Sequence, residues 1–187
     1  MVYSFMYPNI GRVNHEAPIS GEPVNSGNPF TVKSPEWMVM IDDVLKSTVG
    51  DFEKFAELFD WDSSSSRLTT GDFGNNLFTS SSLRHSMLEL MIPNGSYAPV
   101  LEGKMNTGAH IDLVTIVRLG NIKQVKVKLQ EIAFTNCRIQ HFNQKRDRLV
   151  LGIYITSKIN TVNEYDQGGN ALGQTVSTVD YSTNNAE

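Results

Sequence analysis

The sequence lacks several features on which common protein functions depend. Its 187 residues include one cysteine, Cys137, which excludes an internal disulfide and a metal site built from several cysteines. No segment approaches the roughly 20 consecutive apolar residues that a bilayer-spanning helix needs. Charged residues make up only 19% of the chain, with 16 basic and 20 acidic side chains. Nucleic-acid-binding proteins normally carry a basic excess, so this balance disfavours that class.

The N-terminal residues also lack a basic stretch, and their apolar run is too short for a secretory signal peptide. We therefore expect a cytoplasmic protein that would leave the cell only through a dedicated machine. Hydrophobic residues make up 40% of the chain, which is typical of a folded protein. A chain of this length suits one domain with a terminal extension.

The motifs indicate no convincing catalytic site. Residues 168–175 imitate a phosphate-binding loop, but Gln174 replaces the lysine that would contact the phosphates, and the residues that follow favour a strand over a helix. This segment predicts a glycine-rich turn without a nucleotide. Cys137 lies beside Arg138 and near His141, which leaves a small cysteine hydrolase as a competing hypothesis, although no signature of such an enzyme surrounds it.

The other titratable residues have structural interpretations. His110 and Asp112 would share one face of a strand, but no third metal ligand is near them in the sequence. Asp42 and Asp43 flank an expected turn, and so do Asp60 and Asp62. Adjacent strand residues point to opposite faces, so solvated strand ends are the favoured interpretation. We expect no catalytic residue, no metal and no cofactor.

The chain divides into an arm and a domain. Residues 8–35 contain five of the seven prolines and no alternation of apolar residues, so residues 1–34 are predicted to form an extended arm. The arm either stays mobile or reaches a neighbouring subunit. Residues 35–184 are predicted to form one domain, with 185–187 as a tail.

Short segments of alternating apolar residues dominate the domain. Strands are expected at 37–41, 85–92, 111–117, 125–129, 132–139, 149–155, 162–165 and 174–181. Gly120 and Asn121 are expected to form a turn, and residues 143–148 a polar connection. Several short strands joined by turns predict a β-barrel or a sandwich.

Two further segments depart from this alternation. The apolar residues of 52–59 recur at three- and four-residue spacing, which taken alone predicts an amphipathic helix. Residues 63–74 combine a serine run with turn-forming residues and predict a solvent-exposed loop.

A short helix is predicted to start at Ser96. Pro99 fits its first turn, and Gly108 fits the left-handed closing position. Leu101 and Met105 share one face of this helix, and we expect that face to pack against the barrel wall.

The basic residues are concentrated in one part of the chain. Residues 111–160 contain nine basic and three acidic side chains, so the remaining residues carry the acidic excess. Such segregation arises by chance on a solvated surface, or it lets basic and acidic surfaces of neighbouring copies meet. Under the second hypothesis the candidate subunit or ring-stacking residues are Arg118, Lys123, Lys126, Lys128, Arg146 and Arg148.

The order of these segments resembles the haemolysin-coregulated protein (Hcp) family, the tube proteins of type VI secretion systems, related in fold to phage tail-tube proteins. The resemblance covers roughly residues 36–184. The matching elements are a strand with an acidic turn at 37–43, Gly50-Asp51, an aromatic stretch at 55–61, a polar loop, a serine–proline helix at 96–108, a Tyr-Asp-x-x-Gly segment at 165–169 and a terminal strand at 177–184. The proline-rich arm is not a usual family feature, and the family would make the aromatic stretch a strand.

The resemblance implies a mostly β fold, a tail-tube-like β-barrel of two packed antiparallel sheets with one short flanking α-helix. It further implies a hexameric ring, stacked rings that form an inner tube carrying effectors, and a contractile sheath and spike as partners. It implies no enzyme activity. A monomeric β-barrel that binds a ligand is the alternative, and the mass in solution separates the two hypotheses.

Overall fold

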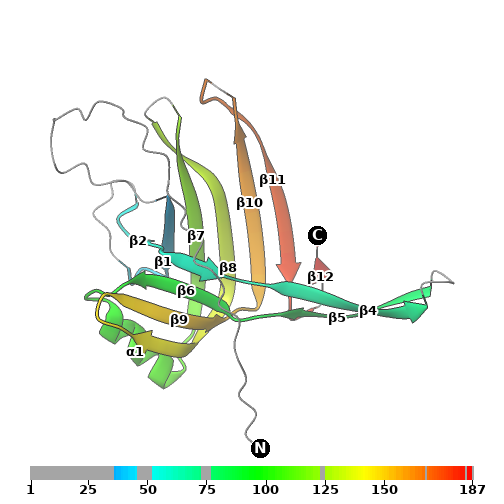
Figure 1. The fold of residues 1–187 in the computed structure, drawn as a ribbon, viewed down its shortest axis with the longest axis horizontal. Coiled ribbons are helices and arrows are strands. Elements are labelled where there is room, and N and C mark those ends of the chain that lie inside the picture. Colours follow the sequence, from blue (N-terminus) through cyan, green and yellow to red (C-terminus); the bar gives the residue numbers. More distant parts are fainter. Residues whose placement is uncertain are drawn as a thin grey trace, which may run out of the picture. The chain divides into compact units, whose positions relative to one another are not determined.

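The protein is mostly β, with antiparallel sheets and one short helix (Figure 1). The structure is a computed structural model and describes residues 36–45, 52–72, 77–122, 125–166, 168–183 and 185–186. The arm predicted for residues 1–34 lies outside the described residues. The elements are β1 (Trp37–Ile41), β2 (Ala56–Glu57), β3 (Asp60–Asp62), β4 (Ser65–Asp72), β5 (Leu77–His85), β6 (Leu88–Pro93), α1 (Ala98–Thr107), β7 (Ile111–Ile122), β8 (Val125–Gln144), β9 (Arg148–Tyr154), β10 (Ser157–Tyr165), β11 (Ala171–Asp180) and β12 (Asn185–Ala186).

Two sheets share the long strand β8. The large sheet has the strand order β12-β11-β10-β8-β7-β1-β2, and the small sheet consists of β3, β6, β9 and the end of β8. The first part of β8 pairs with β7 and β10, and its last part, from Arg138 onward, pairs with β9. All these pairings are antiparallel. The two antiparallel sheets and the short flanking helix that the resemblance implied are therefore confirmed.

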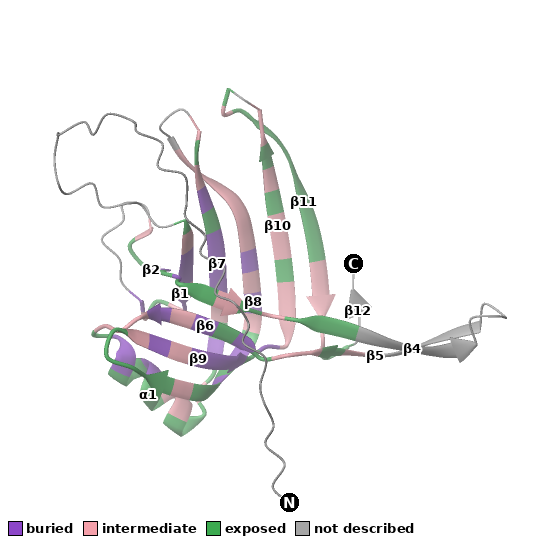
Figure 2. Cartoon of the chain, viewed as in Figure 1, coloured by how far each residue is buried: buried purple, intermediate pink, exposed green. Residues whose placement is uncertain are grey.

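The main core lies between the two sheets. Val114 of β7 and Phe134 of β8 point into it from the large sheet, and both are fully buried. Leu90 of β6 and Leu151 of β9 meet them from the small sheet, where buried and partly exposed residues alternate along β6 (Figure 2). The protein's own apolar side chains thus occupy the space in which a ligand-binding barrel would hold its ligand.

The centre of β7 is buried on both faces. Val117 points away from the main core and forms a second cluster with Met38 and Leu119. Phe52 and Phe55 pack against this cluster, with their rings 5.3 Å apart in an edge-to-face arrangement. Phe52 and Phe55 therefore cover the outer face of the large sheet around Val117.

The segment with helical spacing forms two short strands. β2 places Ala56 opposite Val39 of β1, and β3 places Trp61 opposite Leu90 of β6. Leu58, between the two strands, is buried. The helix predicted from spacing alone is wrong, because backbone pairing with two sheet edges outweighs a local pattern. The strand implied by the resemblance is confirmed.

Most of the serine-rich segment predicted as a loop is strand. β4 pairs with β5 from Ser65 opposite His85 to Asp72 opposite Leu77. The two strands form a sheet of their own, with no other described strand as a partner (Figure 1). A hairpin that pairs only with itself needs no alternating apolar face, so the signal for a strand is absent from the sequence.

Several strand boundaries differ from those predicted. The segments 125–129 and 132–139, expected as two strands, form the single strand β8, and β10 and β11 begin earlier than expected, at Ser157 and Ala171. His85 ends β5 and Leu88 starts β6, so the segment expected as one strand belongs to two. β8 continues to Gln144, which leaves residues 145–147 as the connection to β9. Gly120 and Asn121 lie within β7 rather than in a turn.

Gly120 lacks a side chain for a packing reason. The β7–β8 register shifts between Arg118 and Leu119, and this bulge leaves Leu129 without a cross-strand partner. A Cβ atom at Gly120 would lie 2.7 Å from Cδ1 of Leu129, closer than real contacts allow. The glycine therefore marks a close approach between strands, which sequence reasoning mistook for a turn.

The short helix forms as predicted. Pro99 lies in its first turn, and Gly108 closes it at a φ of +63°. Leu101 is fully buried, and Met105 packs at the edge of the core. Within the part of the chain that the structure describes, no helix has the length and apolarity to cross a membrane.

Candidate assembly surfaces

The basic residues singled out in the sequence lie at two ends of β8. Arg118, Lys126 and Lys128 lie on the β7–β8 hairpin and are called the hairpin basic group. Arg146 and Arg148 lie where β8 turns into β9 and are called the turn basic group. Lys123 lies outside the described residues. Because β8 is 20 residues long, the two groups belong to different surfaces.

Arg118 is engaged within the chain. Its Nη2 and Nε atoms lie 2.8 and 2.9 Å from Oε1 of Glu36. Its guanidinium carbon lies 5.7 Å from the ring centroid of Trp37, the residue opposite it on β1. The charge of Arg118 is thus compensated inside the domain, which reduces what it can offer to another copy.

Lys128 is also engaged, because of the bulge at Leu129. Residues three apart on a regular strand point to opposite faces, but one extra residue brings Lys128 onto the face of Glu131. The Lys128 ammonium forms an ion pair with the Glu131 carboxylate. The charge of Lys128 is therefore also compensated within the domain.

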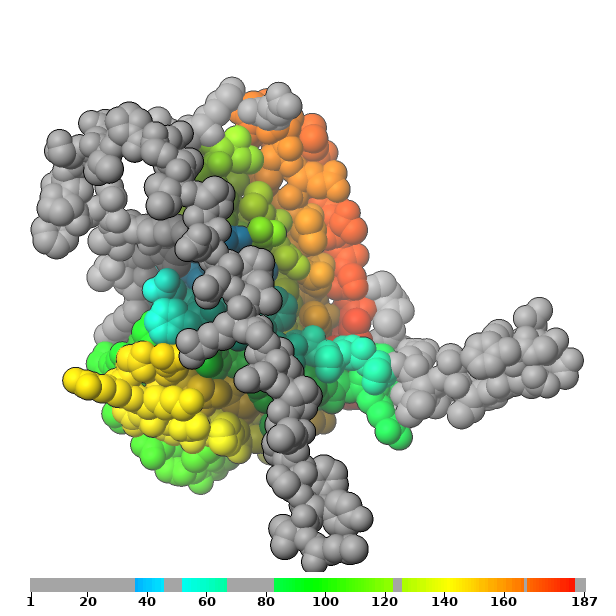
Figure 3. All heavy atoms as spheres, in the orientation of Figure 1, coloured from blue at the N-terminus to red at the C-terminus, as the bar shows by residue number. Residues whose placement is uncertain are grey.

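In the turn basic group, Arg148 is paired within the chain and Arg146 is available. Arg148 forms a two-pronged contact with Asp147, with N–O distances of 3.0 and 3.1 Å. Hydrogen bonding to this guanidinium holds the pKa of the Asp147 carboxyl below its usual value. Arg146 is exposed and has no ion-pair partner among the described residues. The space-filling view shows the surface around this turn, in yellow, at the edge of the molecule (Figure 3).

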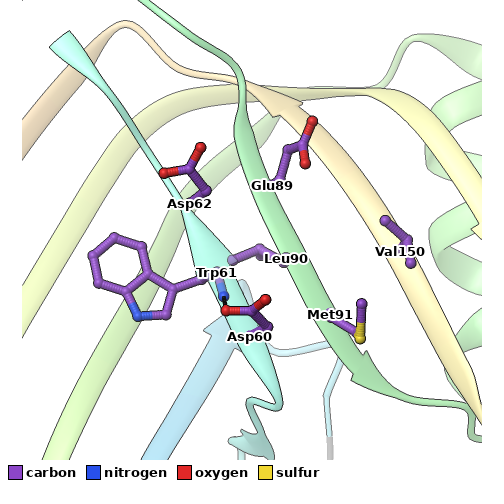
Figure 4. Close-up of a pocket in the computed structure, with 7 residues that line it drawn as sticks. All are labelled: Asp60, Trp61, Asp62, Glu89, Leu90, Met91 and Val150. Carbon is purple, nitrogen blue, oxygen red and sulfur yellow. Dashed lines mark hydrogen bonds between the residues drawn. The ribbon is translucent and has the colours of Figure 1, made fainter. Parts of the chain in front are cut away.

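The small sheet carries an acidic outer face. Asp60 and Asp62 alternate with Trp61 on β3, and Glu89 of β6 lies opposite Asp62. Figure 4 shows the Trp61 ring pointing away from Glu89. The three carboxylates border a shallow hollow of about 70 Å³ whose other lining residues include Met91. None of them has an ion-pair partner within the described residues.

A larger hollow shares Glu89 with this one. It measures about 340 Å³, and its lining residues are Met87, Glu89, His141, Val150, Leu151 and Gly152. At Gly152 the strands β8 and β9 approach closely, because a Cβ atom there would lie 2.9 Å from Cβ of His141, the residue opposite it. The outer face of the small sheet is therefore concave, acidic and partly apolar.

Asp42 is not the solvated strand end that the sequence predicted. Its backbone adopts a φ of +44°, and its side chain is only 24% exposed. Oδ1 accepts hydrogen bonds from the N–H groups of Asp112 (3.0 Å) and Leu113 (3.1 Å), and Oδ2 lies 3.1 Å from Nζ of Lys104. One carboxylate thus joins β1, α1 and β7. Its neighbour Asp43, with a side chain 72% exposed, is solvated as predicted.

Cys137 does not have the environment of a nucleophile. Its side chain is fully buried, and burial, together with the nearby Asp42 carboxylate, raises the pKa of the thiol to about 12. A reactive cysteine needs a lowered pKa and access to solvent. The hydrolase hypothesis therefore loses the residue on which it depended.

This burial predicts slow chemical modification of Cys137. A shift from 9.0 to about 12 lowers the thiolate fraction at pH 8 by roughly a thousandfold. We expect iodoacetamide to modify the native protein at least about a hundredfold more slowly than the urea-unfolded protein. Equal rates in the two states, followed by mass spectrometry, would contradict the buried position of this thiol.

The remaining motifs have structural roles. Nε2 of His110 lies 3.2 Å from Oδ1 of Asp112, and the described residues contain no group of three ligands that could hold a metal. Asp166 accepts a hydrogen bond of 2.8 Å from the N–H of Asn170, and Gly169 takes a φ of +86°. The strand β11 follows directly. The predicted glycine-rich turn is confirmed.

Solved structures share this arrangement of strands and helix. A structure described as a type six secretion system protein superposes with a TM-score of 0.71 at 13% identity, covering 82% of this chain and 100% of that chain. Hcp1 from Salmonella typhimurium gives 0.62 at 15% identity, covering 81% and 97%. Hcp1 from the E. coli EAEC 042 pathovar gives 0.63 at 12% identity, covering 79% and 99%. The chain has the Hcp fold.

The sequence alone shows less of this relationship than the structure does. No protein-family model matches the chain, and neither does any curated protein. The Hcp fold is therefore visible here through the order of its elements and the way they pair.

Two features of this Hcp-fold domain were missed by sequence reasoning. The acidic outer face combines residues of β3 and β6. Asp62 and Glu89, which lie opposite each other in the sheet, are 27 positions apart in the sequence. The junction at Asp42 depends on a carboxylate that receives donors from α1 and β7. The only sequence signal for Asp42, Asp60 and Asp62 was an acidic residue near an expected turn, which is also the signal of a solvated residue.

Proposed function

We propose that this chain is the tube protein of a type VI-like contractile secretion system. In this proposal copies of the domain form a closed ring, six in number, and the rings stack into an inner tube that carries effectors. The sheath and spike of the machine are its further partners. The protein is made in the cytoplasm and leaves the cell through the machine itself.

The observation that carries the proposal is the extent of the structural match. Nearly the whole length of each compared structure is covered, together with 79–82% of this chain. A fold alone does not fix a function. The proposal gains support from the described surfaces, where the acidic outer face of the small sheet and the turn basic group offer complementary charges to neighbouring copies.

A monomeric ligand-binding barrel has less support. The space between the sheets is packed with fully buried side chains such as Phe134 and Leu151. The hollows described above lie on the outer face of the small sheet. A ligand could contact that face, but it would not occupy a barrel interior.

Electron microscopy of the purified protein tests the proposal. We expect ring-shaped particles of uniform diameter with a central opening, and end-to-end stacks of rings at high protein concentration. Particles the size of a single domain at every concentration would contradict it.

Arg146 has no ion-pair partner in the described part of the chain, and this leads to a prediction about stacking. If stacking uses the turn basic group, Arg146→Glu shortens the stacks while leaving single rings intact, because it places like charges against an acidic surface. One molar salt should have a similar effect, since it reduces the screening length to about 3 Å. Lys54→Glu is the control, because Lys54 is an exposed residue outside both basic groups. Stack lengths that ignore both the substitution and the salt would exclude electrostatic stacking through this turn.

A further inference from the structure

The β4–β5 hairpin leaves the domain at the cross-strand pair Ser65 and His85. Tyr181, the residue directly after β11, contacts both members of this pair. Its hydroxyl oxygen lies 2.6 Å from Oγ of Ser65, and its ring lies 4.1 Å from the His85 ring, centroid to centroid. The Tyr181 side chain thus contacts the first residue of β4 and the last residue of β5.

Other contacts complete this hairpin base. The His85 ring also contacts Tyr154 at the end of β9, with the two ring centroids 5.5 Å apart. The N–H of Ser86 donates to the carbonyl oxygen of Ser64 at 2.9 Å, and the N–H of Ser64 donates to Oγ of Ser86 at 3.0 Å. The two chain segments are therefore joined immediately before the hairpin starts.

Tyr181 itself has a firm position that does not depend on the hairpin. Its N–H donates to the carbonyl oxygen of Thr156 at 2.9 Å. In the turn that follows, Oδ1 of Asp180 accepts hydrogen bonds from the N–H groups of Ser182 (2.8 Å) and Thr183 (3.2 Å). β12 then pairs with Asp180 and the residue before it. The C-terminal turn is thus attached to the large sheet, and the hairpin is attached to the turn.

We propose that Tyr181 controls the orientation and order of the β4–β5 hairpin, so that the C-terminal turn acts as a conformational control element for this hairpin. Beyond its base the hairpin pairs with no other described strand, so the contacts at Ser65 and His85 decide its direction. An isolated two-stranded hairpin is marginally stable in water. Tyr181 also packs at the edge of the main core, but it is only partly buried there. The two main sheets have their own pairings and fully buried residues. Withdrawal of Tyr181, by a substitution or by a partner that binds the C-terminal turn, therefore frees the hairpin without unfolding the two main sheets. This inference does not depend on the proposed function.

Hydrogen exchange measured by mass spectrometry on the full chain tests this proposal. In Tyr181→Ala we expect the amides of β4 and β5 to exchange roughly tenfold faster than in the wild type, because a ring contact and a hydrogen bond are both lost. The amides of β6 and β9 should keep their wild-type rates. Tyr181→Phe and Ser65→Ala remove the same hydrogen bond, so each should give the same smaller increase, and combining them should add nothing further.

Tyr165→Phe is the matched control. It also removes a tyrosine hydroxyl, which donates to the carbonyl oxygen of Lys128 at 3.2 Å. Tyr165 ends β10, whereas Thr156, the partner of Tyr181, directly precedes that strand. The substitution should therefore leave the exchange of β4 and β5 unchanged. Wild-type exchange of β4 and β5 in Tyr181→Ala would overturn the proposal. So would an equal acceleration in β6 and β9, because Tyr181 would then be an ordinary residue supporting the core.

Discussion

Replacing Leu101 by aspartate is expected to prevent the domain from folding. Leu101 is fully buried on α1 and belongs to the main core. An aspartate there would place a charge among apolar side chains with no partner, which costs more than about 4 kcal/mol. Because single domains are stable by only about 5–15 kcal/mol, we expect loss of soluble expression and, in any protein recovered, a strongly lowered Tm.

Val100→Asp provides the matched control for this substitution. Val100 precedes Leu101 on the same helix but is 51% exposed, so the same new charge meets water. We expect expression and Tm close to those of the wild type, within the range usual for surface substitutions. A well-folded Leu101→Asp protein would show that α1 does not pack on the core, and the structural comparison would lose one of its elements.

The second large effect is expected at Asp42. Asp42→Ala removes the acceptor of two backbone N–H groups and the partner of Lys104, and it leaves an alanine in a left-handed conformation. Hydrogen bonds to a charged group contribute about 1.5–3 kcal/mol, so we expect a total loss of about 3 kcal/mol. For a chain of this size that lowers Tm by roughly 10 °C, as calorimetry would measure.

Two variants separate the causes at Asp42. Asp42→Asn keeps an oxygen acceptor and tolerates the positive φ, so we expect about half the loss. Asp43→Ala removes the adjacent carboxylate, which makes an exposed ion pair with Lys54, and it should change Tm by no more than about 2 °C. Equal effects of Asp42→Ala and Asp43→Ala would contradict the role of Asp42 in joining β1, α1 and β7.

The elements that were predicted correctly are those whose structure is set by residues close together in the sequence. The start and end of α1 follow from the preferences of Pro99 and Gly108, and the buried position of Leu101 follows from helical periodicity. β6 buries alternate residues, and β1 is a short apolar run with three of its five residues buried, so both strands were visible in the sequence.

Other elements depend on partners that are distant in the sequence. The aromatic stretch around Phe55 has helical spacing, yet its short strands form because β1 and β6 offer unpaired edges. The bulge at Leu129 changes which face Lys128 occupies, and no local signal marks it except Gly120, which was interpreted as a turn. Charge counting located the basic segment correctly in the sequence but could not show that its residues lie at both ends of β8.

The measurement that tests the central claim most directly is the mass of the full chain in dilute solution, by size-exclusion chromatography with light scattering across micromolar concentrations. The Hcp fold and the tube function proposed for it predict a closed ring with six times the mass of one chain. Fragments of the assembly at the lowest concentrations should re-form the ring as concentration rises, because ring closure depends on mass action. A strictly monomeric mass over the whole range would contradict the account.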